Sequence, residues 1–309
     1  MRTVSVVIAV FNGVPYIRRA IDSALDQSYP PHEVIVIDDG SQDTTPQLLK
    51  EYGSKIIMRR FDNAGVATAM NRGLELATGD YVAFLDHDDV WFRDKVKMQV
   101  ESLVSFPNAG LSCSNYAVRP VGMEDRRMLR HYSKLRSLMD IDPAQVCLTK
   151  PLTRLLAENF VGTSTAVMVS RAVTQKVGWF NKNYKISGDY DYWLRCAAVA
   201  DFTVLRDVLF YKRTHATNIS ASTVHMLAEH EVVLKDFARL HPETIQDGLQ
   251  GIYSYALANT CYLLGDACFR ENKRREGFSH YKDALRARQT PLNITRYLYK
   301  SAKKTLRLS

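Results

Sequence analysis

Three kinds of feature are missing from this chain of 309 residues. Its five cysteines form no CxxC pair, and their odd number and wide spacing exclude a disulfide framework and a zinc site built on paired cysteines. No apolar run approaches the roughly 20 residues that a membrane-spanning helix needs. Neither GxGxxG nor GxxxxGK followed by Ser or Thr occurs, so the sequence offers no glycine-rich loop for phosphate. We therefore expect a cytoplasmic protein that binds phosphate, if at all, by other means.

The composition is that of a globular protein, with 46% hydrophobic and 24% charged residues. The net charge is +8, and much of the excess lies late in the chain, at Lys273, Arg274, Arg275, Lys300, Lys303, Lys304 and Arg307. No nucleic-acid-binding motif accompanies these residues, so we expect no nucleic-acid partner. The basic C-terminal region is a candidate for peripheral contact with the inner face of the membrane. A solvated helix face is the simpler alternative.

The most informative stretch is an apolar strand that runs into carboxylates. Residues 81–85 have no polar face, which is typical of a buried strand, and Asp86, Asp88 and Asp89 follow. Because side chains alternate along an extended chain, Asp86 and Asp88 should point to the same side. Close carboxylates repel unless a cation lies between them, so we expect a divalent metal, Mn²⁺ or Mg²⁺, shared with a phosphate. The alternative is an acidic turn that caps the next helix.

Strands and helices alternate through the first part of the chain. The patterns predict strands over 4–10, 33–37, 55–58 and 81–85 and helices over about 15–27, 44–52 and 66–74. Such alternation favours an α/β fold with a mostly parallel sheet and helices on both faces. The second strand ends in Asp38 and Asp39, at the same edge as the acidic triplet. An aspartate there can accept hydrogen bonds from the ribose or base of a nucleotide, although a simple turn would use the same residues.

These motifs together resemble the glycosyltransferases of family 2, which have the Rossmann-like GT-A fold. The resemblance is dense from residue 3 to about 106 and continues in pieces to about 220. It is carried by Ser5–Asn12, Ile21–Ser28, Val36–Ser41, Asn63-Ala64-Gly65, Asn71-Arg72-Gly73 and Gly79–Asp89.

The resemblance implies roles for individual residues. Asp88 and His215 would hold the metal on the diphosphate of a nucleoside-diphosphate sugar. The nucleotide-sugar-binding residues would be Asp39 at the base, Asp86 near the ribose, Arg213 at the diphosphate, and Asn12, Asn63 and Asn71. His215 could equally be an ordinary loop histidine, and Arg213 a solvated charge at a strand end.

The catalytic base implied by the resemblance is Asp189, in the segment Ser187-Gly188-Asp189-Tyr190-Asp191. Gly188 stands where the family often has Glu, so a supporting carboxylate is missing, and Asp191 is a rival for the role. Asp189 could also serve only as the cap of the following helix. A base opposite the leaving group would deprotonate the acceptor hydroxyl and give single displacement with inversion at the anomeric carbon.

The expected activity is that of an inverting, metal-dependent hexosyl- or related transferase with a glycan or lipid-linked acceptor, in cell-surface polysaccharide biosynthesis. A sugar nucleotidyltransferase is one alternative, but Phe11-Asn12-Gly13 lacks the basic, glycine-rich signature expected after its first strand. The other is a nucleotide-sugar-binding or scaffold protein without turnover, which Gly188 favours.

We expect a GT-A catalytic domain over 1–220, with a nucleotide-sugar half over about 1–106 and an acceptor half over about 107–220. Residues 126–156 are charged and irregular, which suggests an acceptor-side insertion or closing loop. Residues 159–170 suggest a strand whose small residues let the backbone approach the sugar. A helical C-terminal appendage should fill 221–309, with a basic fourth helix at its end.

Overall fold

The computed structural model describes residues 2–120, 130–132, 145–215, 218 and 222–288. The chain divides into two compact units, Met1–Leu155 with Asn159–Asn218 and Leu156–Glu158 with Ile219–Ser309. Most of the insertion expected over 126–156, and the basic fourth helix, lie outside the described residues. The division of the catalytic domain into a nucleotide-sugar half and an acceptor half stays a prediction.

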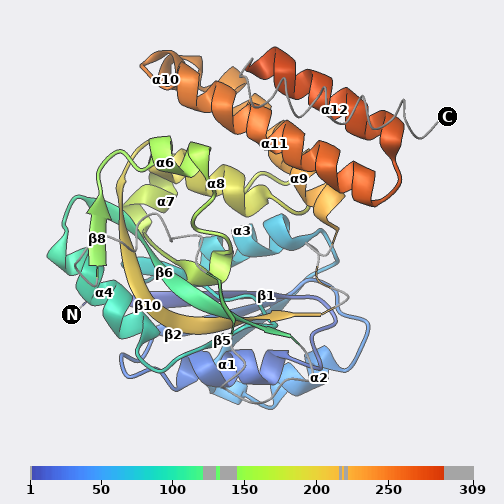
Figure 1. Cartoon of the computed structure of the whole chain (residues 1–309). Helices are drawn as coiled ribbons and strands as arrows, with labels where there is room; N and C mark the ends of the chain where they lie inside the picture. Colours follow the sequence, from blue (N-terminus) through green and yellow to red (C-terminus); the bar gives the residue numbers. More distant parts are fainter. Residues whose placement is uncertain (1, 121–129, 133–144, 216–217, 219–221, 289–309) are drawn as a thin grey trace. The chain divides into compact units, whose positions relative to one another are not determined.

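The first unit is built on one sheet (Figure 1). Its strands are β1 (Val4–Val10), β2 (Glu33–Asp38), β3 (Ile57–Arg60), β4 (Tyr81–Phe84), β5 (Val90–Trp91), β6 (Ala109–Pro120), β7 (Arg130–Tyr132), β8 (Gln145–Leu148), β9 (Val167–Ser170) and β10 (Asp201–Thr214). Their order is β3-β2-β1-β4-β9-β6-β10-β5, with β7 beside β6 and β8 beside β10.

The sheet is parallel in its first part and mixed as a whole. Strand β1 pairs in parallel with β2 and β4, and β2 pairs in parallel with β3. Beyond β4 the strand β9 is antiparallel to both of its neighbours, whereas β6 and β10 are parallel to each other. The predicted α/β fold with helices on both faces is confirmed, and its sheet is more mixed than the alternation of the first 85 residues suggested.

The helices and 3-10 turns of the first unit connect these strands. They are α1 (Ile17–Leu25), α2 (Thr45–Lys50), η1 (Gly53–Lys55), α3 (Val66–Leu76), α4 (Lys95–Ser105), η3 (Ser164–Ala166), α7 (Arg171–Val177) and α8 (Gly188–Ala197), while α6 (Leu152–Ala157) crosses the boundary of the two units. Helices α1 and α2 lie on one face of the sheet and α3 on the other (Figure 1). This arrangement follows from right-handed crossovers between parallel strands.

Burial explains why the first elements form where the sequence predicted them. All seven residues of β1 are buried, as expected for a strand covered on both faces. Helix α1 buries Ile17, Ala20, Ile21 and Ala24, a stripe at helical spacing.

An aromatic cluster fixes helix α8 on the sheet. Phe180 stacks on Tyr192 with ring centroids 4.0 Å apart, and its edge meets Phe84 of β4 at 5.5 Å. Trp193 packs against Phe84 at 5.8 Å and is fully buried. Because these contacts are rigid, they determine where the first turn of α8, which carries Asp189, lies relative to β4.

The strand expected over 159–170 is shorter than predicted. Only Val167–Ser170 forms β9, and the residues before it make the 3-10 turn η3. Gly162 takes a positive φ of 78°, which turns the backbone out of an extended conformation. The hydroxyl side chains that follow donate hydrogen bonds to Asp86 and Asp89, and their residues do not continue the sheet.

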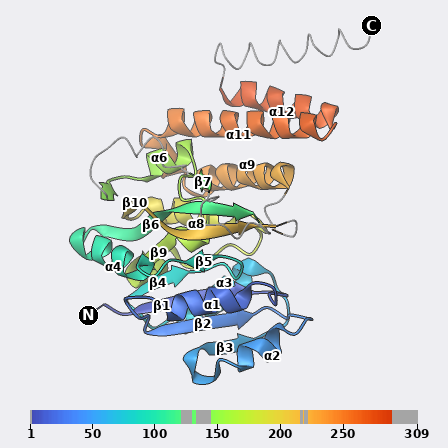
Figure 2. The same cartoon turned by 60° about the horizontal axis from the view of Figure 1, so that its bottom comes forward.

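The second unit is helical where the structure describes it. Its helices are α9 (Thr223–Leu240), α10 (Pro242–Gln246), α11 (Gln250–Arg270) and α12 (Arg274–Ala287), in agreement with the helices expected there. Helices α11 and α12 lie side by side in both views (Figures 1 and 2). They approach closely at Gly265 and Gly277, where a Cβ on either glycine would lie 3.0 Å from the other's carbonyl oxygen.

This close approach predicts opposite effects for the same substitution at two positions of α11. In Gly265→Ala the new Cβ would lie 2.6 Å from the Tyr281 ring, so we expect a loss of about 1–3 kcal/mol in the unfolding free energy of the helical unit. In Gly251→Ala no described atom lies within 4 Å of the new Cβ. The better helix propensity of alanine should therefore raise the unfolding free energy of the helical unit by up to about 1 kcal/mol.

Hydrogen–deuterium exchange of α11 and α12 peptides in the full chain measures both effects. Equal protection in the two variants would contradict the glycine contact.

Candidate functional site

The site lies where β2 and β4 end. Both strands run parallel to β1, so their carboxyl ends meet at one edge of the sheet, the position where open α/β sheets bind ligands. Asp38 is the last residue of β2 and Asp39 follows it, and the acidic stretch follows β4. Buried carboxylates need donors or cations, and the structure supplies a different set at each strand end.

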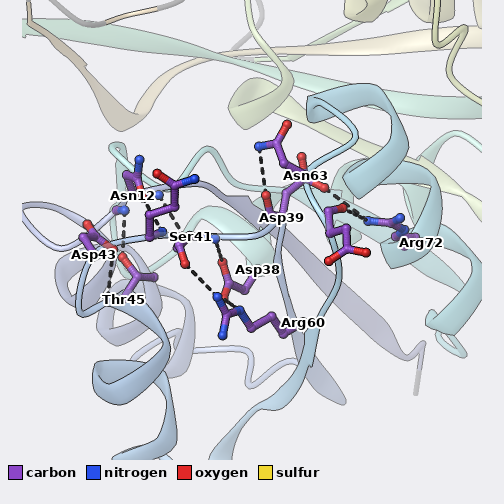
Figure 3. A network of polar contacts seen from close by, with 12 residues as sticks. Asn12, Asp38, Asp39, Ser41, Asp43, Thr45, Arg60, Asn63 and Arg72 are labelled. Carbon is purple, nitrogen blue, oxygen red and sulfur yellow. Dashed lines mark hydrogen bonds and ion pairs between the residues drawn. The ribbon is translucent and has the colours of Figure 1, made fainter.

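At the end of β2, Asp38 has a structural role (Figure 3). Its Oδ1 accepts a hydrogen bond of 2.9 Å from the Ser41 backbone N–H, and its Oδ2 lies 3.2 Å from Arg60 Nε. Arg60 also donates to the Ser41 carbonyl at 2.8 Å. These contacts fix the turn after β2 and leave Asp39 as the carboxylate that faces the next loop.

Asp39 accepts hydrogen bonds from the loop that begins α3 (Figure 3). The backbone N–H groups of Ala64 and Gly65 donate to its carboxylate at 3.1 and 2.8 Å, and Arg72 Nη1 lies 3.1 Å away. Asn63 donates from its side chain to the Asp39 carbonyl at 2.9 Å. A carboxylate has about four acceptor sites, so these donors leave limited capacity for a ligand.

Asn12 shapes the neighbouring loop. It adopts a positive φ of 52°, its backbone N–H donates to Ser41 Oγ at 2.9 Å, and its Oδ1 accepts from the Gln42 backbone N–H at 2.8 Å. Beside it lies an open hollow of about 780 Å³ lined by Gly40, Gln42, Arg60, Phe61, Asp62 and Asn63. The ring of Phe11, the residue after β1, is exposed near this edge.

Asn71 lies away from the loop ends and holds two parts of the fold together. Its Nδ2 donates to the Phe180 carbonyl at 2.9 Å, and its Oδ1 accepts from the Phe180 backbone N–H at 2.8 Å. The side chain is buried, and both of its polar groups are engaged by the chain itself. The structure therefore gives Asn71 a role in holding the fold together, whereas the sequence predicted a role in donor binding.

At the end of β4, hydroxyl groups of the η3 region surround the carboxylates. Asp86 accepts from the Thr163 and Ser164 hydroxyls at 3.0 and 2.6 Å. Asp89 is buried and accepts from the Thr165 hydroxyl at 2.7 Å and from the Arg213 backbone N–H at 2.9 Å.

The charged groups of this region change one another's pKa values. Burial, together with the neighbouring Asp86 and Asp88, holds the pKa of Asp89 well above its usual range. Burial acts to lower the pKa of Lys212, but the Asp89 and Asp86 carboxylates outweigh it and raise that pKa above its ordinary value. Asp189 is another of the carboxylates that raise it, so Lys212 brings positive charge close to both the acidic stretch and α8.

Asp88 and His215 meet although 127 residues separate them in the chain. Asp88 Oδ2 lies 2.9 Å from His215 Nε2, and Asn218 Nδ2 donates to the same carboxylate oxygen at 2.9 Å. The His215 ring stacks on the Tyr16 ring with centroids 4.8 Å apart. The Arg213 guanidinium lies 4.7 Å from the centre of the Tyr16 ring.

The donor set of this pair fits a divalent metal. A carboxylate oxygen and an imidazole nitrogen lie 2.9 Å apart, and this combination suits Mn²⁺ better than Mg²⁺, which prefers oxygen alone. Within the described residues, no group of three or more His, Cys, Asp or Glu side chains could hold a metal ion by itself. A cation here would therefore need ligands from a substrate or from water.

Asp189 and Asp191 have different environments in the first turn of α8. Asp191 is buried and forms an ion pair with Arg195, with contacts of 2.8 Å to Nη2 and 3.1 Å to Nε. Arg195 is itself held by the carbonyls of Val177 and Trp179. Asp189 is partly exposed and accepts from the Tyr190 backbone N–H at 2.7 Å. The carboxylate of Asp191 is thus committed to the fold.

Several side chains at the site have contacts that the sequence did not predict. They are the hydroxyl residues Thr163, Ser164 and Thr165, the ring of Tyr16, the ammonium of Lys212 and the amide of Asn218. The cluster of hydroxyls was visible at 163–165, but nothing in the sequence connected it with carboxylates almost 80 positions earlier.

Solved structures identify the class of this fold. A crystal structure of S. aureus TarS 1–349 in complex with UDP-GlcNAc aligns with 92% of this chain and 81% of its own, with a TM-score of 0.68 and 17% identity. The mannosyltransferase PcManGT from Pyrobaculum calidifontis, in complex with GDP-Man and Mn²⁺, aligns with 99% of this chain and 81% of its own, with a TM-score of 0.60 and 19% identity. The fold is that of the GT-A glycosyltransferases.

Residues 5–178, more than half of the chain, match the family described as Glycosyl transferase family 2, so this chain belongs to that family and is a glycosyltransferase. An uncharacterised glycosyltransferase of Rickettsia prowazekii (strain Madrid E) is 31% identical over 248 residues, which cover 76% of this chain and 71% of the relative. TuaG of Bacillus subtilis (strain 168), a putative teichuronic acid biosynthesis glycosyltransferase, is 42% identical over 106 residues, covering 33% of this chain and 42% of TuaG. No helix in the described part of the chain is long and apolar enough to cross a membrane.

The contacts of Asn71 lead to a prediction that separates a structural role from a ligand contact. Asn71→Ala leaves the buried N–H and C=O of Phe180 without their partner, so the unfolding free energy should fall by about 2–4 kcal/mol. Urea denaturation measures this change. The matched control Asn63→Ala, at an exposed loop position with one hydrogen bond to a backbone carbonyl, should cost less. Unchanged stability in Asn71→Ala, with loss of donor affinity alone, would contradict the structural role.

Proposed function

We propose that this glycosyltransferase moves a sugar, with inversion, from a nucleoside-diphosphate sugar to a glycan or lipid-linked acceptor in cell-surface polysaccharide assembly. The observation that carries the proposal is the meeting of Asp88 and His215 at the sheet edge where Asp39 also lies. This edge offers one place for a nucleotide and another for its diphosphate.

The nucleotide would bind along the ends of β1 and β2. Asn63 lines the hollow near Gly40, and Asn12 accepts a hydrogen bond from Gln42 of the same lining. Asp39 directly precedes Gly40, and the exposed ring of Phe11 offers a surface for a base. Asp86 would accept a hydrogen bond from a ribose hydroxyl, since its carboxylate is partly exposed and held by hydroxyl donors. Asn71 would act on the donor only indirectly, through the Phe180 backbone that it holds.

Asp88 and His215 would hold a divalent cation, Mn²⁺ or Mg²⁺, against the diphosphate. A cation bound there neutralises the charge that develops on the leaving diphosphate. Arg213, whose guanidinium is held over the Tyr16 ring, would add a fixed positive charge beside the same phosphates. The Mn²⁺ in the PcManGT complex and the acidic and imidazole donors of this chain support the choice of metal.

Asp189 is the better candidate for the catalytic base. It lies in the first turn of α8 and is partly exposed. It is close enough to Lys212 for its negative charge to raise the pKa of that lysine. The partial exposure lets solvent reach Asp189, whereas Asp191 is neutralised by Arg195. Abstraction of the hydroxyl proton on the side opposite the diphosphate would give inversion in one displacement.

The polysaccharide setting rests on relatives and not on a pocket. TuaG, which shares 42% identity over a third of this chain, is assigned by its name to teichuronic acid biosynthesis. The exposed basic residues Arg274 and Arg275 at the start of α12 would bring the helical unit to an anionic membrane surface. Residues 1–220 would carry the transfer reaction and 221–309 the attachment.

The first test is a donor panel with and without metal. The chain should release a nucleoside diphosphate from one of UDP-, GDP- and dTDP-sugars when Mn²⁺ is present, and a chelator should abolish the release. Asp88→Asn should weaken the response to Mn²⁺ by about 10–100-fold, because it removes the charged ligand. Release of the nucleoside diphosphate that is unchanged by the chelator and by Asp88→Asn would contradict the proposed role of Asp88 in binding the metal.

A second test compares the two acidic residues of α8. Asp189→Asn should lower transfer at least about 100-fold while donor binding and the unfolding free energy stay near wild type. Asp191→Asn should instead lower the unfolding free energy, since Arg195 loses its partner. If Asp189→Asn retained transfer and a folded Asp191→Asn lost it, Asp191 and not Asp189 would be the catalytic base.

A further inference from the structure

Asp89 joins the segments that carry the proposed metal ligands. Its side chain is buried, with only 1% of the residue exposed. Its Oδ2 accepts from the Thr165 hydroxyl at 2.7 Å, and its Oδ1 accepts from the Arg213 backbone N–H at 2.9 Å. One carboxylate thus connects η3 with the end of β10.

Thr165 forms a second bond on the other side of the acidic stretch. Its Oγ1 accepts from the Asp86 backbone N–H at 3.0 Å while its proton goes to Asp89. The one hydroxyl therefore holds the segment 86–89 at both ends, and Asp88 lies between these two points. Thr165 is itself fully buried, so water does not compete for these bonds.

The same bridge determines the position of His215. Arg213, whose N–H bonds to Asp89, lies two residues before His215 in the chain. Asp88 lies one residue before Asp89. The bridge Thr165–Asp89–Arg213 consequently connects the two chain segments at the point where Asp88 Oδ2 and His215 Nε2 come within 2.9 Å.

We propose that Thr165 is a positioning residue for the divalent cation: through Asp89 and the Arg213 N–H, its hydroxyl holds Asp88 and His215 at the spacing that one shared cation requires. The inference rests on the proposed metal role of Asp88 and His215. Thr165 itself touches neither cation nor substrate. Residues that orient metal ligands from behind commonly change metal affinity by about 10–100-fold when they are removed.

The chain offers a matched set of variants. Thr165→Val keeps the shape of the side chain and removes the hydroxyl, whereas Thr165→Ser keeps the hydroxyl and removes a methyl group. Thr203→Val is the control, because Thr203 of β10 is also fully buried and its Oγ1 has no hydrogen-bond partner among the described residues. The three variants separate the effect of the hydrogen bonds from the effect of altering a buried threonine.

Mn²⁺ binding is measured by the loss of the free-ion EPR signal, with the full chain alone and with UDP or GDP present. Thr165→Val should bind Mn²⁺ about 10–100-fold more weakly than the wild type, and Thr165→Ser and Thr203→Val should stay near it. Urea denaturation of each variant shows that it is folded at the temperature of the binding experiment.

The outcomes distinguish this inference from the proposed function. A folded Thr165→Val that binds Mn²⁺ as tightly as Thr203→Val overturns the inference and leaves the metal role of Asp88 and His215 standing. A Thr165→Ser variant as weak as Thr165→Val also overturns it, since the hydroxyl would then not be the cause. A wild-type chain that binds no Mn²⁺ with either nucleotide overturns both.

Discussion

Negative charge gathered at one edge of the sheet is the constraint on which the rest of this structure depends. The parallel register of β1, β2 and β4 brings Asp38, Asp39 and the acidic stretch to the same edge, and most of these carboxylates are buried. Buried carboxylates are costly unless donors or cations surround them. Each one here has its own solution, and the solutions together define the loops of the site.

The solutions fall into two groups that suit different tasks. Asp38, Asp39 and Asp89 are held mainly by backbone N–H groups, hydroxyls and arginines, which fix geometry. Asp88 faces the His215 imidazole at 2.9 Å, and a carboxylate oxygen and an imidazole nitrogen are both groups that can bind a divalent cation. Asp38, Asp39 and Asp89 thus fix the loops of the acidic edge, whereas Asp88 is available to a ligand.

The sequence was sufficient wherever local pattern decides structure. Strand β1 forms at 4–10 as expected because a stretch that is apolar except for Ser5 favours burial, and the end of β2 at Asp38 and Asp39 follows the same local pattern. Single residues with distant partners were less accessible. The expected strand at 159–170 gives way to η3 because its hydroxyls bond Asp86 and Asp89, almost 80 residues away. The amide of Asn71 likewise meets the Phe180 backbone 109 residues later, a pairing that no local spacing reveals.

The separation between Asp88 and His215 has a consequence for how the protein is made. At a synthesis rate of about 5–20 residues per second, the 127 positions from Asp88 to His215 take roughly 6 to 25 seconds to emerge. All carboxylates of the edge exist by residue 89, whereas η3, Arg213 and His215 leave the ribosome much later. During that interval Asp86, Asp88 and Asp89 lack the side chains and N–H groups that later surround them, and counterions or water must supply the compensation. The order of the chain therefore makes the cationic side of the site the last part to be completed.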